Sequence, residues 1–352
     1  MIRATGRFLL LLLLITGLPS GLVLTARPPA AAAQALPKVR LVATGGTIAN
    51  RSGVRLSPAE LVRLAPAIDR HARIDAEAFA NVSSGQLTLE QWLQLAKRIS
   101  TILGDDAECA GVVVTSGTDT LEELAYFLHL TVRSDKPVVV VGSMRPPDAV
   151  VFDGAANLVA AVRVAAAAES HGRGTLVVMN EEIHGARDVT KTDAQRLDAF
   201  QSRGGGDHDP GSAVVDRGTD EIARRPLIGQ QHVDARQGRQ RRRVELRLRP
   251  AALLGSPRVG HAIRVHGAEP SGARLERVEA LRYAMSKRAV VVSATRTGAG
   301  RVVPTGEPGR VLAVPGTLGA EDLTPIKARI LLMLALARQT DPRDIQRMFR
   351  EY

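Results

Sequence analysis

The chain has 352 residues, enough for two domains, and its 45% hydrophobic and 24% charged residues are typical of a soluble globular protein. Its single cysteine, Cys109, excludes an intrachain disulfide and any zinc site built on two or more cysteines. A net charge of +11 is compatible with nucleic-acid or membrane-surface binding, but the basic residues are concentrated in one segment.

Residues 1–35 have the pattern of an export signal. Arg3 and Arg7 precede an unbroken apolar run at 8–15, and the small residues at 33 and 35 suit a cleavage site. A membrane anchor is the alternative, but Pro19 and the Ala/Pro-rich residues further on argue against it. No later stretch reaches the ~18 apolar residues that span a bilayer. We therefore expect a cleaved signal peptide and a periplasmic or secreted protein without membrane contact.

Residues 36–202 alternate between predicted strands and helices. This order predicts an α/β domain with a mostly parallel sheet covered by helices on both faces, and ligands bind such sheets at the carboxyl ends of the strands. A capping box, Thr120 with Glu123, marks the start of one helix. The predicted strands are 39–43, 111–114, 137–141 and 175–179, and the predicted helices are 87–99, 120–130 and 155–168.

Residues 203–282 differ in kind from the rest. Fifteen arginines and no lysine occur between 201 and 280, and no Phe, Tyr or Trp between 201 and 282. One interpretation is an Arg-rich surface insertion or linker. A second is a nucleic-acid-binding segment, although no aromatic side chain is present for base stacking. A third is a stretch translated out of frame, because GC-rich codons read in a wrong frame encode excess Arg, Ala, Gly and Pro.

Regular patterns return after residue 283. A strand is predicted at 289–292 and an amphipathic helix at 325–338. A terminal helix is predicted at 341–352, with Asp341 as its cap and Pro342 in its first turn.

Two motifs place hydroxyl groups where predicted strands end. Thr44-Gly-Gly-Thr47 follows the first strand, and its paired glycines let the backbone turn sharply and approach a ligand. Thr115-Ser-Gly-Thr118-Asp119 follows the second strand and precedes a helix whose N-terminal amides favour negative charge. A threonine here can act as a nucleophile, and the amides as an oxyanion hole. Each motif alone also fits a simple turn or helix cap.

A third motif, Arg187-Asp-Val-Thr-Lys191-Thr192, follows the strand predicted at 175–179. A neutral lysine beside a threonine hydroxyl can act as its activating base, whereas an exposed loop lysine is the simpler alternative. We interpret His129 and His184 as structural or surface residues, because no ligand types at metal-binding spacing accompany them.

Together these motifs resemble the asparaginase/glutaminase family, specifically its exported bacterial type. The resemblance covers about 38–200 and about 283–352, with several long motifs in the same order. The matching stretches are Ala43-Thr-Gly-Gly-Thr-Ile-Ala49, Thr115-Ser-Gly-Thr-Asp-Thr-Leu-Glu-Glu123, Lys136-Pro-Val-Val-Val-Val-Gly-Ser-Met-Arg-Pro146, Asp153-Gly154 with Asn157, Arg187-Asp-Val-Thr-Lys-Thr192, Lys327-Ala-Arg-Ile-Leu-Leu332, and Asp341-Pro with Ile345-Gln346.

The resemblance implies hydrolysis of L-asparagine by a threonine nucleophile, with L-glutamine as a further candidate substrate and no metal or cofactor. Thr47 matches the nucleophile, Thr118 the second catalytic threonine, and Lys191 the lysine that helps to activate it. Asp119 matches the acid that binds the substrate's α-ammonium group, and Ser84 the serine that binds its α-carboxylate.

The resemblance also implies a larger N-terminal catalytic α/β domain, here 36–202, a smaller C-terminal α/β domain, and a homotetramer. The anomalous residues 203–282 replace the linker and the start of the small domain, whose remainder is 283–352. We therefore expect the small domain to be disrupted in its first half.

Two positions near the predicted site depart from the family pattern. The family usually has a tyrosine on a mobile loop after the first glycine turn, but residues 50–61 contain no aromatic side chain. Gly85 follows Ser84 where the family often has a polar side chain on the substrate, which predicts weaker binding there.

Two other functions remain open at this point. An inactive relic, or a periplasmic amino-acid-binding protein, would keep the pocket of Thr47 and Asp119 without turnover. An Arg-rich nucleic-acid binder is disfavoured by the export signal, so we expect a small-molecule substrate and no nucleic-acid partner.

The frameshift interpretation makes a direct prediction about the coding DNA. Reading the stretch that encodes 203–282 in the other two frames should restore aromatic residues and alternating apolar strands. If no other frame restores them, the frameshift interpretation is wrong.

Overall fold

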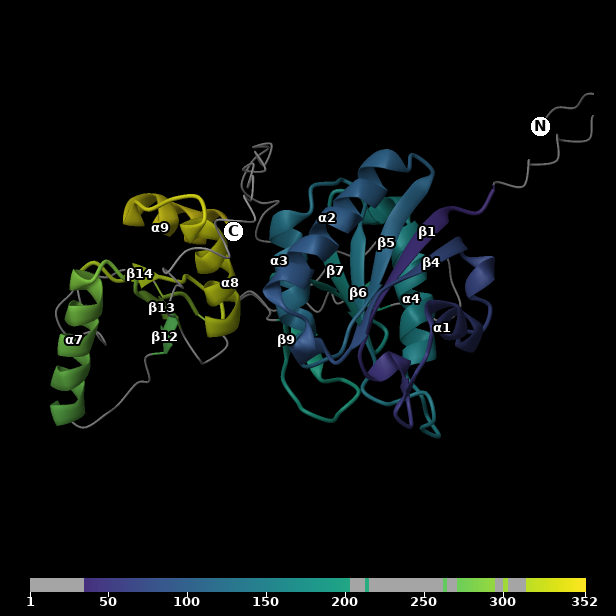
Figure 1. Cartoon of the computed structure of the whole chain (residues 1–352), viewed down its shortest axis with the longest axis horizontal. Helices are drawn as coiled ribbons and strands as arrows, with labels where there is room; N and C mark the ends of the chain where they lie inside the picture. The colour runs from purple at the N-terminus through teal and green to yellow at the C-terminus, as the bar shows by residue number, and fades with distance from the viewer. Residues whose placement is uncertain (1–34, 203–212, 215–261, 265–270, 295–299, 303–314) are drawn as a thin grey trace, which may run out of the picture. The chain divides into compact units, whose positions relative to one another are not determined.

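The computed structural model describes residues 35–202, 213–214, 262–264, 271–294, 300–302 and 315–352 (Figure 1). The predicted signal peptide, apart from Ala35, and most of the anomalous segment 203–282 lie outside the described residues. We call the described residues up to 214 the N-terminal lobe and those from 262 onward the C-terminal lobe.

A mixed sheet forms the centre of the N-terminal lobe. Its strand order is β11-β8-β7-β6-β5-β1-β4. β4, β1, β5, β6 and β7 run parallel to one another, β8 pairs antiparallel with β7, and β11 pairs antiparallel with β8. The predicted α/β class is therefore confirmed. The strands are β1 (Lys38–Gly45), β4 (Arg73–Val82), β5 (Cys109–Thr115), β6 (Val138–Val141), β7 (Thr175–Met179), β8 (Glu182–Gly185) and β11 (Ala213–Val214).

Helices cover both faces of this sheet, as the valine-rich strands predict. α2 (Leu89–Asp105) and α3 (Leu121–Thr131) pack on one face, and α1 (Pro58–Leu64) and α4 (Gly154–Ala166) on the other (Figure 1). Each face has its own apolar core. The parallel strands therefore end together at one edge, where their loops can form a site.

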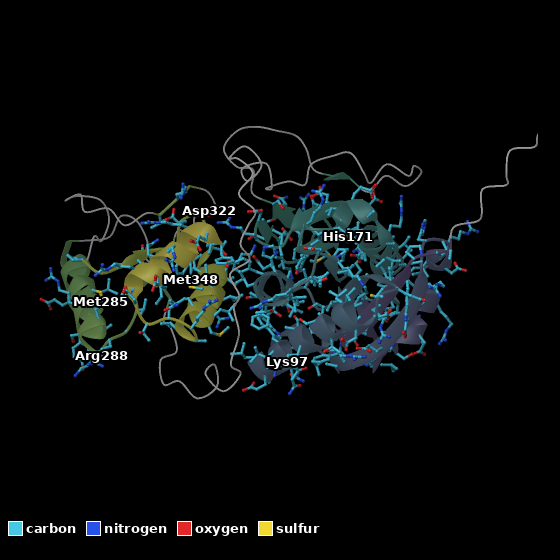
Figure 2. All side chains as sticks on the ribbon, turned by 90° about the horizontal axis from the view of Figure 1, so that it is seen from above. Lys97, His171, Met285, Arg288, Asp322 and Met348 are labelled. Carbon is cyan, nitrogen blue, oxygen red and sulfur yellow. The ribbon has the colours of Figure 1, made fainter. Side chains whose placement is uncertain are left out.

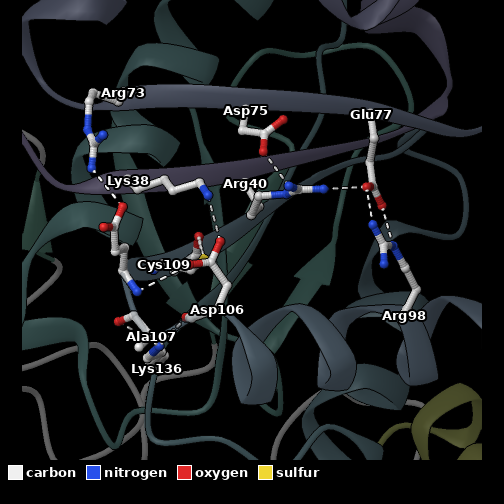
Figure 3. Close-up of polar contacts among 12 residues, drawn as sticks. Lys38, Arg40, Arg73, Asp75, Glu77, Arg98, Asp106, Ala107, Cys109 and Lys136 are labelled. Atoms are coloured by element: carbon white, nitrogen blue, oxygen red, sulfur yellow. Dashed lines mark hydrogen bonds and ion pairs between the residues drawn. The ribbon is translucent and has the colours of Figure 1, made fainter.

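The strand β4 was not predicted from the sequence, because charged residues alternate along it. Arg40 of β1 forms ion pairs with Asp75 and Glu77 of β4, and Arg98 of α2 also binds Glu77 (Figure 3). The acidic side chains of β4 thus pair with arginines of β1 and α2, and the strand as a whole pairs with β1 in a parallel register. The hydrogen bonds to Arg98 and Arg40 lower the pKa of Glu77.

The predicted capping box of α3 is wrong. Thr120 does occupy the N-cap, but its backbone has φ −123° and ψ 20° and its side chain caps no amide. An N-cap normally has extended backbone geometry that directs its oxygen to the following amides. The Thr120 Oγ1 and Glu123 Oε2 atoms are instead buried without a hydrogen-bond partner.

The C-terminal lobe has a small parallel sheet with helices around it. Its strands are β12 (Ala262–Arg264), β13 (Val292–Ala294) and β14 (Leu318–Gly319), and its helices are α7 (Ser271–Ser286), α8 (Pro325–Leu336) and α9 (Pro342–Glu351). The strand predicted at 289–292 therefore begins later than expected. Asp341 caps α9 as predicted, accepting a hydrogen bond of 2.8 Å from the Arg343 amide.

The helix α8 is not amphipathic, contrary to expectation. Seven of its residues are buried, including Lys327 and Ile330. The cause is that α8 packs on α3 as well as on α9 and the strands β12 and β13. Met348 of α9 lies in the same apolar core (Figure 2). None of the described helices is long and apolar enough to cross a membrane.

Both predicted structural histidines have structural contacts. His129 Nδ1 accepts a hydrogen bond of 3.3 Å from the Thr175 amide, which joins α3 to β7. His184 of β8 is fully buried, and its Nδ1 lies 2.9 Å from Ser202 Oγ. Burial, helped by the charge of Lys327, lowers the pKa of His184 to about 4.

His184 therefore predicts a pH-dependent loss of stability. The unfolded chain takes up a proton on this residue near its ordinary pKa of 6.5, before the folded protein does. Stability contributed by the neutral imidazole is thus lost as pH falls from about 6.5 towards 4, by an amount on the order of 3 kcal/mol. Urea unfolding at several pH values should show a weaker pH dependence for His184→Gln in this window. Equal pH dependence in both proteins would contradict the assignment.

Candidate active site

Two glycine turns meet at the edge where β1 and β5 end. Gly46 has φ +87°, in the left-handed region that favours glycine. A Cβ atom on Gly46 would lie 2.3 Å from the Gly117 backbone nitrogen, so the two backbones are in direct contact. Thr47 follows the first glycine and Thr118 the second. The glycines therefore bring the turns that carry these threonines together.

A third turn joins them at the end of β4. Ser84 begins the short helix η3 (Ser84–Gln86) and is only 4% exposed. A Cβ on Gly117 would lie 2.9 Å from Ser84 Oγ, which shows how closely the serine packs on this turn. The exposed Gly85 beside it has no atom within 4 Å of a Cβ position. Ser84 is thus part of the site wall, and Gly85 adds no side chain to the open space next to it.

Other hydroxyl groups in these motifs hold the strands. Thr44 Oγ1 donates to the Thr115 carbonyl at 2.7 Å, and the Thr44 amide lies 3.3 Å from Thr115 Oγ1. Both side chains are buried between the ends of β1 and β5. Of the remaining threonines in the two motifs, Thr47 is half-buried and Thr118 is only 7% exposed.

Lys191 contacts two of the predicted site residues. It ends the strand β9 (Val189–Lys191), which pairs with β10 (Phe200–Ser202). Its Nζ donates to Thr118 Oγ1 at 2.9 Å and to Asp119 Oδ1 at 3.0 Å. The Lys191 side chain is 15% exposed, whereas that of Asp119 is 84% exposed. Lysine, threonine and an open carboxylate therefore form one hydrogen-bonded group.

Thr47 follows Gly46, whose backbone contacts Gly117, the residue before Thr118. It begins the short helix η1 (Thr47–Ala49) and is half-buried, while Ile48 and Ala49 after it are buried. Thr47 is therefore more exposed than the two residues that follow it in the same turn.

Glu122 is a site-supporting residue that sequence reasoning missed. It is buried in α3 and accepts hydrogen bonds from Thr190 Oγ1 at 3.0 Å and from the Lys191 amide at 3.1 Å. These bonds fix the strand that carries Lys191. The sequence clue was that this glutamate lies between Leu121 and Leu124 in a helix made mostly of apolar residues.

The C-terminal lobe reaches the same strand. Lys327 of α8 is buried, lies 3.9 Å from Glu122 Oε2, and donates to the carbonyls of Arg187 (2.8 Å) and Val189. Arg187 in turn pairs with both oxygens of Asp322 through its two terminal nitrogens. The segment that leads to Lys191 is therefore bound by charged groups of both lobes.

Glu123, the residue after Glu122 in α3, has a shifted pKa. Burial, and then the nearby charge of Glu122, raise the pKa of Glu123 to about 7. Among the described residues, no three His, Cys, Asp or Glu side chains converge in a group that could hold a metal ion.

This geometry first defines a class of protein. Hydroxyl, lysine and carboxylate groups converge at the carboxyl ends of parallel strands, as in enzymes of the α/β class.

Comparisons with known proteins identify the family. The model described as "Asparaginase, N-terminal" matches residues 38–210, and that described as "Glutaminase/Asparaginase C-terminal domain" matches 266–349. The chain is 38% identical to L-asparaginase 2 of Bacillus subtilis (90% of this chain, 87% of that protein) and 34% identical to L-asparaginase 2 of Escherichia coli (91% and 95%). A crystal structure of a probable cytoplasmic L-asparaginase from Campylobacter jejuni matches with a TM-score of 0.72 at 31% identity, covering 90% of this chain and all of that one. The chain belongs to the asparaginase/glutaminase family of amidohydrolases.

The buried pair of Glu122 and Lys327 predicts strong coupling in stability. Removing one partner leaves the other charge buried and unpaired, which costs on the order of 3–5 kcal/mol. In a double-mutant cycle with Glu122→Gln and Lys327→Met, urea unfolding should give a coupling above about 1 kcal/mol.

An exposed ion pair provides the matched control. Arg347 and Asp344 of α9 lie 3.1 Å apart with side chains 62% and 37% exposed. Their coupling should not exceed about 0.5 kcal/mol. A Glu122–Lys327 coupling as small as this would show that the buried pair does not stabilise the β9 segment.

Proposed function

We propose that this protein hydrolyses L-asparagine to L-aspartate and ammonia, with L-glutamine as a further candidate substrate. The observation that carries the proposal is the contact of Lys191 with Thr118 and Asp119, directly after Gly117, whose backbone contacts the Gly46 turn that precedes Thr47. Relatives of the chain are named L-asparaginases, and one from Pseudomonas fluorescens, 33% identical, is named glutaminase-asparaginase.

Thr47 is the proposed nucleophile. Its Oγ1 forms a bond to the carbon of the side-chain amide, and the carbonyl oxygen becomes a negatively charged tetrahedral oxygen. The backbone amides at the beginning of α3 favour negative charge at this edge of the sheet. The carbon–nitrogen bond then breaks, ammonia leaves with the transferred proton, and an ester with Thr47 remains for water to hydrolyse.

Thr118 and Lys191 are the proposed proton-transfer pair. Lys191 Nζ lies 2.9 Å from Thr118 Oγ1, a distance at which a proton can pass between the two groups. The Lys191 charge also stabilises any negative charge that develops on Thr118. With Lys191 as the neutral amine, Thr118 would take the proton of the attacking hydroxyl while its own proton passes to Lys191 Nζ, and the reverse transfer would return one proton to the leaving nitrogen.

The ends of the substrate are assigned to Asp119 and Ser84. Asp119 presents an exposed carboxylate, of which only Oδ1 is bound by Lys191, so Oδ2 can accept from the α-ammonium group. Ser84 would hold the α-carboxylate. Gly85 offers no side chain to assist it, and a preference between asparagine and glutamine rests on one methylene, worth only ~1–3 kcal/mol.

We further propose that residues 1–35 export the protein to the periplasm or the medium and that the mature chain forms a homotetramer. The relative from Haemophilus influenzae is named a probable periplasmic L-asparaginase. We also propose that residues 203–282 depart from the family; the two family models leave 211–265 between them, but they match 203–210 and 266–282.

Ammonia release from L-asparagine tests the proposed function. Thr47→Ala should lower kcat by about 10³-fold or more, because the nucleophile is removed. Thr47→Ser is the matched variant, and it should retain measurable activity because it keeps a hydroxyl group at the same position.

Other outcomes discriminate between the alternatives. If the parent and Thr47→Ala both bind L-aspartate equally and neither releases ammonia, the protein is a binding protein or relic and the hydrolase proposal fails. If Thr47→Ala retains full activity, another residue is the nucleophile.

A further inference from the structure

The chain forms a tight hairpin directly after Thr47. β2 (Asn50–Arg51) and β3 (Val54–Arg55) pair antiparallel, with Asn50 opposite Arg55. Ser52 and Gly53 at its tip have φ +45° and +85°, as in the two-residue turns that suit a hairpin's twist. The Leu56 amide donates to the Ala49 carbonyl at 2.8 Å and closes the base. The hairpin therefore brings Arg55 back beside the Gly46 turn that precedes it.

Arg55 contacts two of the three turns that form the site. Its Nη1 donates to the Gly46 carbonyl at 3.0 Å, and its Nη2 lies 3.4 Å from Ser83 Oγ. Gly46 precedes Thr47, and Ser83 precedes Ser84. The guanidinium is half-buried and so spans from the turn of the proposed nucleophile to the turn of the proposed carboxylate-binding serine.

The bond to Gly46 acts on Thr47 through a shared peptide plane. The Gly46 carbonyl and the Thr47 amide belong to one rigid unit, so a donor on the oxygen also fixes the direction of the Thr47 N–H. The Gly46 amide is held separately by the Val82 carbonyl at 2.9 Å. The Gly46 carbonyl also accepts from the Ala49 amide at 3.2 Å, so Arg55 is one of two donors on this oxygen. Together these bonds restrain a glycine whose own backbone angles are little restricted.

We propose that Arg55 is a positioning residue that holds the Gly46–Thr47 peptide in its reactive orientation. This role rests on the proposed function of Thr47. The hairpin carries no aromatic residue, and its tip is itself held by a contact between Ser52 Oγ and Asp148 Oδ2. A short, tethered hairpin with an arginine at its base thus fixes the turn of the nucleophile.

Only a guanidinium suits this arrangement. Its two terminal nitrogens point in fixed, divergent directions and can reach acceptors on two turns at once, whereas a lysine ammonium is a single point donor. Arg55→Lys should therefore be more active than Arg55→Met but less active than the parent.

Steady-state ammonia release tests the role in the full mature protein. Loss of a charge-assisted hydrogen bond to the nucleophile's turn should lower kcat of Arg55→Met about 10- to 100-fold while KM changes little. Arg51→Met is the matched control, because Arg51 is an exposed arginine on the other strand of the same hairpin, and its kcat should equal that of the parent. Added guanidinium should partly rescue Arg55→Ala.

Hydrogen exchange provides a readout that does not require activity. The amides of 46–50 should exchange faster in Arg55→Met than in the parent, and Arg51→Met should match the parent. Unchanged exchange together with unchanged kcat would overturn the proposal, as would a raised KM with unchanged kcat, which would make Arg55 a substrate-binding residue. If the parent releases no ammonia, the proposed function fails, whereas faster exchange at 46–50 would still show that Arg55 holds this peptide.

Discussion

The backbone contact between Gly46 and Gly117 is the constraint on which the site depends. Any side chain at Gly46 would place a Cβ 2.3 Å from the Gly117 nitrogen, so the ends of β1 and β5 can approach this closely only with glycine there. The buried hydrogen bonds between Thr44 and Thr115 hold the strands directly beneath. The turns that carry Thr47 and Thr118 consequently lie side by side although they are far apart in sequence.

Lys191 is positioned by a different kind of interaction. β9 belongs to a separate two-stranded sheet, so its position is not set by the ladder of the main sheet. Buried charged groups set it instead, because Glu122 binds its backbone and Lys327 of α8 binds the carbonyls just before Lys191. The chemistry of the N-terminal lobe is thereby linked to a helix encoded near the end of the chain.

Continuous apolar strands and periodic helices were predictable from sequence, since burial on both faces leaves a strong local pattern. β4 was not, because its charged residues are neutralised by Arg40 and Arg98, which are distant in sequence. The motifs led to Thr118, Asp119 and Lys191, whose contacts the structure shows. The supporting roles of Glu122 and Arg55 arise only from tertiary neighbours, and no local pattern marks them.

The most direct test of the account is to locate the covalent intermediate. Protein mixed with L-asparagine, quenched in acid and digested with trypsin would give Thr47 in peptide 41–51 and Thr118 in peptide 99–133. Mass spectrometry should find one added aspartyl group on the Thr47 hydroxyl in peptide 41–51, and none in Thr47→Ala. An aspartyl ester in peptide 99–133 of an active protein would contradict the account and make Thr118 the nucleophile.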